Sequence, residues 1–503
     1  MNSLKLRSTV FTAAALLASC AVGPNFKAPE PPHSAGFVPS GQLAPQTAAA
    51  ALPGGEAQRF VDGKDIPGQW WTLFQSVELN ALIERALANS PTLEAAQAAL
   101  RQANETAAAQ RGSYYPSVSG AVESQRQKAS GAAFGIPGFP SSYFYNLDTA
   151  SVNVSYTLDA FGGVRRQVEA LNAQAEYQRF ALEASYLTLT SNIVTAAINE
   201  ASLRAQLAAT DDIARSQQKQ LEITQRRLDA GGASRADVLQ QQATLQNTLA
   251  GLPTLRSQLA QQRNQLAAFV GSLPADYTGA AFTLDSLKIP QDLPVSLPSK
   301  FVEQRPDVRE YSALLHAATA QVGIATANML PQITLSGSYG QDASAFSNLF
   351  QPSSNVWSLI GSLTQPLFKG GQLRHQRRAA IAGAQEAAAN YKATVITAFQ
   401  NVSNTLYALQ ADAEALAAQA VAEQSAKDSL SLVQAQYKSG GASYVQVLSA
   451  EQSYQTAAVA LVKARAQRFA DTAALFQALG GGWWNRNERL AGTKPAADSA
   501  RTP

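Results

Sequence analysis

The sequence contains few of the cysteine and histidine residues that form disulfides, metal sites and Cys/His catalytic pairs. Its 503 residues include one cysteine, two methionines and three histidines. One cysteine cannot form a disulfide within the chain, and His33, His316 and His375 are too scattered for a metal-binding motif or a catalytic pair. Residues 216–219 fit a Ser-x-x-Lys nucleophile pattern, but they lie inside an expected helix and lack the partner motifs. The sequence therefore predicts that the protein is not an enzyme and needs no metal or cofactor.

An excess of one charge is also missing, as are long apolar runs. Residues 1–19 include two basic and no acidic residues, so the rest of the chain has 37 Lys and Arg against 36 Asp and Glu. This balance excludes the strongly basic surface of nucleic-acid-binding proteins, so no nucleic-acid partner is expected. After residue 19 no run of about 18 apolar residues occurs, so no membrane-spanning helix is expected. If the chain crosses a membrane, it must do so as β-strands.

The N-terminus has the pattern of an export signal. Lys5 and Arg7 precede an apolar run, Val10–Ala18, that is too short to span a bilayer. The run ends in Leu17-Ala18-Ser19-Cys20, which looks like the lipobox of bacterial lipoproteins. We therefore expect a signal peptide at residues 1–19 and a covalent lipid on Cys20. The alternative is an ordinary signal peptide followed by an unrelated cysteine.

The chain contains an internal repeat. Proline and leucine positions match at an offset of 215 residues, and glycine motifs match at 209: Pro91, Leu100 and Pro116 with Pro306, Leu315 and Pro331, and Gly231-Gly232-Ala233-Ser234 with Gly440-Gly441-Ala442-Ser443. Proline and glycine residues that recur in the same order in both halves favour a tandem duplication over chance similarity between alanine-rich helices. After the signal peptide, the expected segments are a leader at 20–75, a first repeat at 76–271, an equatorial linker at 272–303, a second repeat at 304–480 and a tail at 481–503.

Each repeat contains two segments in which apolar and polar residues alternate, as in a sheet with one apolar face. The apolar positions are Val118 and Val122; Val152, Val154, Tyr156 and Leu158; Ile333, Leu335 and Tyr339; and Trp357, Leu359 and Leu363. We expect strands at about 115–127, 150–160, 331–342 and 356–367, joined by loops at 128–149 and 342–355. Their length suits transmembrane strands, which have about 9–11 residues. Two soluble hairpins packed on helices are the alternative.

Four strands are too few to form a closed barrel. Backbone groups in hydrocarbon must all be hydrogen-bonded, so membrane strands have to close on themselves, and single-chain barrels have at least about eight strands. Several copies of the chain should therefore contribute to one barrel. The strand count alone is compatible with a dimer or a trimer.

Two long helices are expected in addition, because 165–230 and 384–439 contain neither proline nor glycine. At 1.5 Å per residue, each spans on the order of 100 Å. Each ends at a glycine pair followed by a potential capping box, Ser234 with Asp237 and Ser443 with Gln446. These features predict two helical hairpins whose tips either serve only to turn the chain or contact another protein.

Six ordered segments resemble the TolC-like outer-membrane factors, in particular the lipoprotein branch that includes OprM and NodT-type proteins. The resemblance runs almost end to end and includes residues 20–26 (CAVGPNF), 70–74 (WWTLF), 158–162 (LDAFG), 305–309 (RPDVR), 366–371 (PLFKGG) and 478–483 (ALGGGW). It implies a mainly α-helical fold with transmembrane β-structure. In this fold a homotrimer forms a 12-stranded outer-membrane barrel, four strands per chain, on a long periplasmic α-helical barrel.

The resemblance also implies partners and site residues. A lipid-anchored trimer in the outer membrane would be the exit duct for small molecules such as drugs, joined to a periplasmic adaptor protein and an inner-membrane RND transporter. The adaptor would contact the hairpin tips, at Gly231, Gly232, Ala233, Ser234, Arg235, Gly440, Gly441, Ala442, Ser443 and Tyr444. The equatorial belt would include Ser272–Lys300, in which Pro290, Pro294 and Pro298 exclude a long helix.

Asp428 is the candidate for a periplasmic gate, because the family closes this end with acidic residues on the second repeat's inner helix. It is the only carboxylate between Glu423 and Gly440. A ring of symmetry-related carboxylates would repel one another and bind cations, although a solvated aspartate on a helix surface is the more common case. Two functional alternatives remain open, namely the outer-membrane component of type I protein secretion and a non-conducting trimeric envelope protein.

Overall fold

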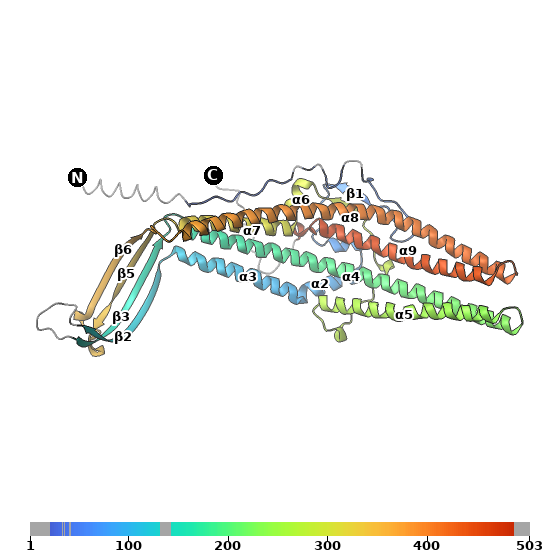
Figure 1. Ribbon diagram of the computed structural model, residues 1–503, viewed down its shortest axis with the longest axis horizontal. Coiled ribbons are helices and arrows are strands. Elements are labelled where there is room, and N and C mark those ends of the chain that lie inside the picture. Colours follow the sequence, from blue (N-terminus) through green and yellow to red (C-terminus); the bar gives the residue numbers. More distant parts are fainter. Residues whose placement is uncertain (1–20, 33, 35, 40–41, 131–141, 487–503) are drawn as a thin grey trace. The chain divides into compact units, whose positions relative to one another are not determined.

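The structure, a computed structural model, describes residues 21–32, 34, 36–39, 42–130 and 142–486 (Figure 1). The helices are α2 (Val77–Asn89), α3 (Pro91–Arg111), α4 (Gly163–Asp229), α5 (Arg235–Phe269), α6 (Pro298–Gln304), α7 (Pro306–Ala327), α8 (Gln372–Lys438) and α9 (Tyr444–Ala478). The strands are β1 (Arg59–Asp62), β2 (Ser117–Ser130), β3 (Ser142–Leu158), β4 (Asp292–Val295), β5 (Gln332–Ala343) and β6 (Asn355–Thr364). Among these helices, none combines the length and the apolar character needed to cross a bilayer.

The chain forms two compact units. The first unit comprises Met1–Pro29, Arg101–Tyr177 and Tyr311–Tyr391, and the second comprises Glu30–Leu100, Gln178–Glu310 and Lys392–Pro503. The helices α3, α4, α7 and α8 each contribute residues to both units. Each unit therefore contains residues from both sequence repeats.

The first unit contains an antiparallel four-stranded sheet in the order β2-β3-β5-β6. The predicted loop at 128–149 was too long. In the structure β2 runs to Ser130 and β3 begins at Ser142. The stretch Ser142–Thr149 pairs with Glu123–Ser130, and its aromatic residues favour extended backbone. At its other end β3 stops at Leu158 instead of residue 160, because Asp159 accepts hydrogen bonds from the amides of Val164 and Arg165 at the start of α4.

The second unit contains the greater part of two helical hairpins. Both long helices, α4 and α8, have 67 residues, and both return helices, α5 and α9, have 35. Each return helix begins with a capping box, from Ser234 and Asp237 in one hairpin and from Ser443 and Gln446 in the other. Gly231 and Gly440 take positive φ angles of 78° and 84°, which glycine adopts at little cost. Within this unit α8 and α9 lie side by side, as do α4 and α5 (Figure 1).

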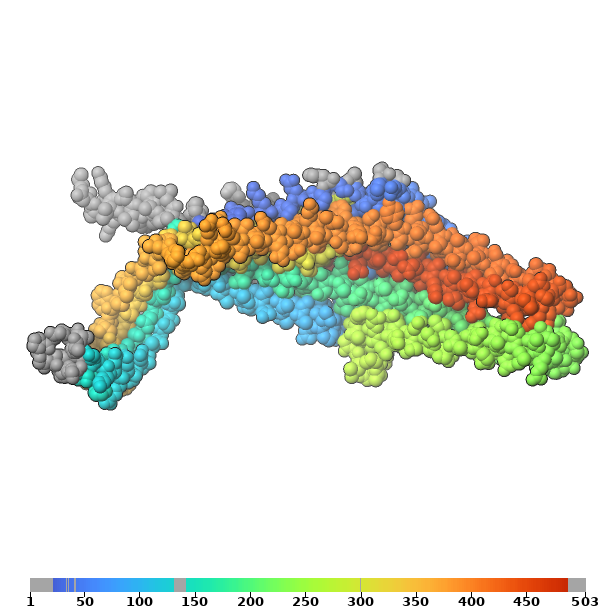
Figure 2. All heavy atoms as spheres, in the orientation of Figure 1, coloured from blue at the N-terminus to red at the C-terminus, as the bar shows by residue number. Residues whose placement is uncertain are grey.

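The largest fully buried side chains of the second unit are mostly aromatic. Trp70 stacks on Phe476 with ring centroids 5.4 Å apart, and Phe180 meets Trp483 edge to face at 5.8 Å. The linker 272–303 contributes short turns, the strand β4, which pairs in parallel with β1, and most of α6. The segment that follows residue 42 lies along α8 (Figure 2), where the Tyr407 hydroxyl donates to the Gln42 amide oxygen.

Candidate functional site

The sheet has one continuous apolar face. Direct cross-strand partners share a face, and the register pairs Val118 with Val154, Val152 with Tyr339, and Tyr339 with Trp357. The face therefore collects every apolar position that the alternating segments predicted: Val118, Val122, Val152, Val154, Tyr156, Leu158, Ile333, Leu335, Tyr339, Trp357, Leu359 and Leu363. Several are largely uncovered, for example Leu359 at 77% exposed and Val122 at 78%. A continuous exposed apolar surface formed by this many residues is typical of a site that contacts a protein or a membrane.

The opposite face of the sheet is polar. It carries serine and threonine side chains, and the Ser338 and Ser358 hydroxyl groups are hydrogen-bonded to each other at 2.8 Å. Its two outer strands, β2 and β6, each pair with one neighbour only among the described residues. The sheet thus presents one polar face, one apolar face and two open edges.

The residues that follow Cys20 form a docked leader in the first unit. Arg166, which is 3% exposed, donates hydrogen bonds to the Val22 carbonyl oxygen at 3.1 Å and to the Asn25 side-chain oxygen at 2.6 Å. Phe26 stacks on His316 with ring centroids 4.3 Å apart. The backbones at Gly23 and Gly323 lie so close together that side chains would not fit between them. A Cβ on Gly23 would lie 2.5 Å from Gly323 Cα.

The leader reaches the base of the sheet. The Val22 amide donates to the Phe161 carbonyl oxygen at 3.1 Å, three residues beyond the end of β3. A Cβ on Gly162 would lie 2.6 Å from Ala21 Cα, so Ala21 packs directly against this turn. Cys20 itself lies outside the described residues.

The two hairpin tips contact each other in the second unit. The Arg227 guanidinium lies over the Tyr437 ring at 4.5 Å, and the Tyr444 hydroxyl donates to the Gln241 amide oxygen. Most of the expected contact residues are exposed or half-buried: Gly231, Gly232, Ala233, Ser234, Arg235, Gly440, Gly441, Ala442 and Ser443. Tyr444 differs from them, because it is 6% exposed and packs between the hairpins. The Tyr444 hydroxyl therefore forms its hydrogen bond within the chain and not with another protein.

Asp428 lies on an exposed part of α8. It accepts a hydrogen bond from the Gln424 amide at 3.0 Å, one turn earlier on the same helix. Within one chain this aspartate is a solvated helix residue. Among the described residues, no group of three or more His, Cys, Asp or Glu is placed to hold a metal ion.

Comparison with known proteins assigns the family. The sequence profile of the outer membrane efflux proteins matches residues 82–272 and 297–481. The chain belongs to the outer membrane efflux protein family. OpmQ of Pseudomonas aeruginosa, a pyoverdine export outer membrane protein, is 30% identical over 437 residues, which cover 86% of this chain and 90% of OpmQ. The outer membrane protein OprJ of the same species is 28% identical over 488 residues, which cover 95% of this chain and 97% of OprJ.

Solved structures agree with this assignment. The outer-membrane channel OprN superposes with a TM-score of 0.83 at 25% identity, covering 92% of this chain and all of the OprN chain. The outer membrane protein VceC from Vibrio cholerae gives 0.76 at 28% identity, covering 83% of this chain and all of VceC. This outer membrane efflux protein therefore has the TolC-like fold, serves as an efflux channel component with a large periplasmic part, and is not an enzyme.

Buried arginines of this efflux protein escaped the sequence analysis. Arg166 holds the leader, and Arg468, which is fully buried on α9, donates to the Thr47 hydroxyl at 3.1 Å and to the Glu56 carbonyl oxygen. Apart from the ion pair of Arg166 with Glu169, these side-chain contacts join residues more than 100 positions apart in sequence, so no local pattern reveals them. No sequence signal distinguishes the two arginines, because each has charged neighbours: Arg165 and Glu169 lie near Arg166, and Arg465 and Asp471 lie near Arg468.

We predict that Arg166→Met frees the leader. The substitution removes charge-assisted hydrogen bonds worth about 1.5–3 kcal/mol each, so trypsin should cleave after Lys27 at least about tenfold faster. Limited proteolysis of the purified protein measures this rate. Arg165→Met is the matched control, because the Arg165 side chain is exposed. Equal cleavage rates in both variants and the native protein would show that Arg166 does not hold the leader.

A second prediction concerns pH. Asp412 on α8 faces Asp471 on α9, and burial, helped by this neighbour, raises the pKa of Asp412 to about 8. Because the folded pKa lies above the unfolded value of 3.8, the stabilisation is complete below pH 3.8 and lost as the pH rises through about 8. The unfolding temperature should therefore fall between pH 6 and 8 and level off above pH 8, and Asp412→Asn should make this fall smaller. Glu414→Gln, an exposed change on the same helix, should leave the fall unaltered, and an unchanged profile in Asp412→Asn would contradict the prediction.

Proposed function

We propose that three copies of this chain form the exit duct of a tripartite RND-type efflux pump, which passively conducts small molecules out of the cell. The observation that carries this proposal is the sheet, with its uncovered apolar face, polar face and two open edges. In lipid each open edge has to be hydrogen-bonded. Pairing β6 of one copy with β2 of the next satisfies both edges, and closing the ring with three copies gives about 12 strands, within the known range for barrels.

The apolar face of such a barrel faces the lipid, and the serine-rich face lines the pore. Strands of 10–17 residues are long enough for this arrangement, because a tilted transmembrane strand needs about 9–11 residues. The relatives' names favour small solutes over proteins as cargo. OpmQ is named for pyoverdine export, CusC of Escherichia coli for cation efflux and ArpC of Pseudomonas putida for antibiotic efflux.

The docked leader supports lipidation of Cys20. Ala21 packs at the turn that follows β3, so a lipid on the preceding residue would be attached where the sheet meets the helices. In the proposed barrel this level is the membrane surface, and an acyl chain there could enter the same leaflet. Mass spectrometry of the mature N-terminal peptide tests this assignment, and an unmodified Cys20 thiol would contradict it.

The exposed tip residues are the proposed contact for a periplasmic adaptor protein. The two glycine turns lie at the same end of the second unit (Figure 1), and the tip contact between Arg227 and Tyr437 joins them into one surface. Tyr444 supports this surface from beneath and is not counted among its contact residues. The inner-membrane transporter that meets the adaptor determines which substrates enter the duct.

We predict that Asp428→Asn increases the resting conductance of the trimer. Three copies of an exposed carboxylate near one axis would bind cations and narrow the path, and neutral asparagine would not. Single-channel recording in planar bilayers measures the change. Glu386→Gln is the matched control, since this exposed glutamate lies on the same helix, 42 residues earlier. Equal conductance of the Asp428→Asn trimer and the native trimer would show that Asp428 is not a gate residue.

The proposed function is tested by reconstitution. Purified trimers should form ion-conducting pores in planar bilayers, and the gene should restore export in cells that lack their own duct when the neighbouring adaptor and pump genes are supplied. Trimers that never conduct ions would instead favour a non-conducting envelope protein. Pores that conduct but restore only protein secretion would move the chain to a type I system.

A further inference from the structure

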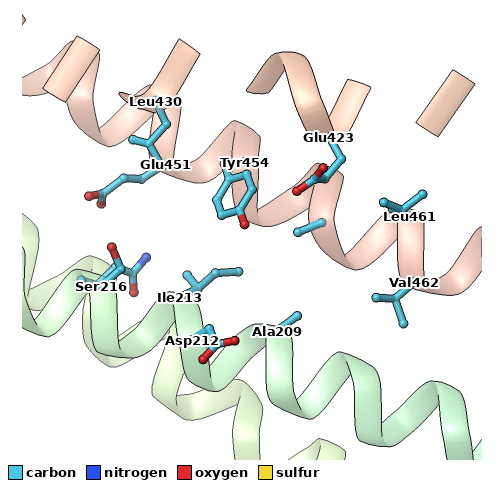
Figure 3. A pocket seen from close by; sticks show the side chains of 12 residues that line it. Ala209, Asp212, Ile213, Ser216, Glu423, Leu430, Glu451, Tyr454, Leu461 and Val462 are labelled. Atoms are coloured by element: carbon cyan, nitrogen blue, oxygen red, sulfur yellow. The ribbon is translucent and has the colours of Figure 1, made fainter. Parts of the chain in front are cut away.

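A cavity of about 450 Å³ lies between the two hairpins of the second unit, within the tip-side halves of the long helices α4 and α8. Figure 3 shows its lining side chains, which project from α4 on one side and from α8 and α9 on the other. A cavity of this volume is large enough for a small organic molecule. Neither the conduit role nor the adaptor contact uses it.

Of the described residues that line the cavity, three carry carboxyl groups and none is basic. Glu451 comes from α9, Glu423 from α8 and Asp212 from α4. Asp212 is exposed at the rim and already forms an ion pair with Arg215. The inner part of the cavity is therefore acidic because of Glu451, with Glu423 beside it.

Two polar side chains of the lining are buried without hydrogen-bond partners. Glu451 is 4% exposed and Gln217 is 1% exposed, and within the described part of the chain neither carboxylate oxygen of Glu451 nor the side-chain amide of Gln217 has a hydrogen bond of ordinary geometry. The amides of Gln241 and Gln434 lie near Glu451, but the Gln241 amide already donates to the Gln217 carbonyl oxygen. Burial raises the pKa of Glu451, and the nearby amides of Gln241 and Gln434 offset this only in part. Buried polar groups without partners are uncommon because each lost hydrogen bond is costly. These two side chains therefore point to an occupant that would satisfy them.

The rest of the lining suits an apolar body with a positive charge. Ile213, Leu430, Leu461 and Val462 supply aliphatic surface, and Tyr454 places an aromatic ring beside the carboxyl groups. An aromatic ring attracts a desolvated cation, and a buried carboxylate pairs with one. A purely apolar occupant would leave Glu451 unpaired, and an inorganic cation would leave the aliphatic surface empty.

We propose that this cavity binds amphiphilic organic cations, with the positive charge at Glu451 and the apolar body against Ile213, Leu461 and Val462. The site lies within the hairpin wall, so it adds a point of substrate retention to a duct otherwise described as passive. It goes beyond the proposed conduit role and is tested by binding alone, so a failed binding test leaves the conductance result unaffected.

The test uses the full-length trimer in lipid nanodiscs with tetraphenylphosphonium as the probe. Isothermal titration calorimetry should show saturable binding, and Glu451→Gln should weaken it at least about tenfold. Triphenylphosphine oxide, a neutral molecule of similar aromatic character, should bind at least about tenfold more weakly than the cation. Glu222→Gln is the matched control, because Glu222 is an exposed carboxylate on α4 outside the cavity lining and its loss should change binding less than twofold.

A second variant reports on the cavity itself. Ser216 lines the cavity and is exposed, so Ser216→Trp fills the space from its rim without opening the core. It should abolish probe binding while the trimer stays intact on size-exclusion chromatography. No binding to the native trimer, equal binding of the neutral compound, or undiminished binding to Glu451→Gln would each overturn the proposal.

Discussion

Leu359→Arg is expected to abolish insertion of the trimer into the outer membrane. Leu359 lies in the middle of β6 on the apolar face, 77% exposed and paired with Gly337. An arginine facing lipid at the bilayer midplane costs about 2–4 kcal/mol per chain, and a trimer contains the substitution three times. Membrane fractionation with gel analysis of unheated samples should show almost no outer-membrane trimer, and export should be lost with it.

Ile360→Arg is the control for Leu359→Arg. The two residues are neighbours on β6, both are apolar and both are more than half exposed. Because successive strand residues point to opposite faces, Ile360 belongs to the polar side of the sheet. Arginine at this position should be tolerated in a water-filled pore, with altered ion selectivity as its main effect. Equal loss of trimer in both variants would show that the apolar face does not contact lipid.

Arg468→Met is expected to detach the segment 47–58 from α9. The fully buried guanidinium donates to Thr47, to the Glu56 carbonyl oxygen and to the Gln58 side chain, and methionine fills the space without these donors. Losing several charge-assisted hydrogen bonds and leaving their acceptors buried should cost about 3 kcal/mol or more per chain. That loss corresponds to a thermal transition lower by roughly 5–10 °C, measured by differential scanning fluorimetry of the purified trimer.

Lys463→Ala is the control for Arg468→Met. Lys463 lies five residues earlier on α9 with an exposed side chain. Surface charges contribute at most about 1 kcal/mol, so the transition should shift by less than about 3 °C. If Arg468→Met unfolds at the native temperature, the segment 47–58 is held by other contacts.

Local patterns predicted much of the fold. Alternation placed the apolar positions of four strands on one face, because the side-chain period of a strand is fixed at two residues. Capping boxes at Ser234 and Ser443 located both helix starts, because they depend only on residues three apart. The long helices could likewise be read from the absence of proline and glycine.

Long-range packing is what the sequence did not reveal. Tyr444 is buried by a contact with Gln241, 203 residues earlier, so its position next to an exposed turn was misleading. The leader motif at residues 22–25 is held by hydrogen bonds from Arg166, which lies more than 140 residues later in the sequence. The cavity around Glu451 requires three helices from both repeats. Such contacts depend on how the hairpins pack, which no single segment encodes.

In the proposed barrel, neighbouring copies join through β6 and β2. Site-specific photo-crosslinking tests it without assuming a register, with p-benzoylphenylalanine placed at Ile360 in cells that produce the full chain. We expect crosslinked dimers and trimers in which the attached peptide lies within residues 117–130 of another copy. Crosslinks confined to one chain, or to other proteins, would contradict it.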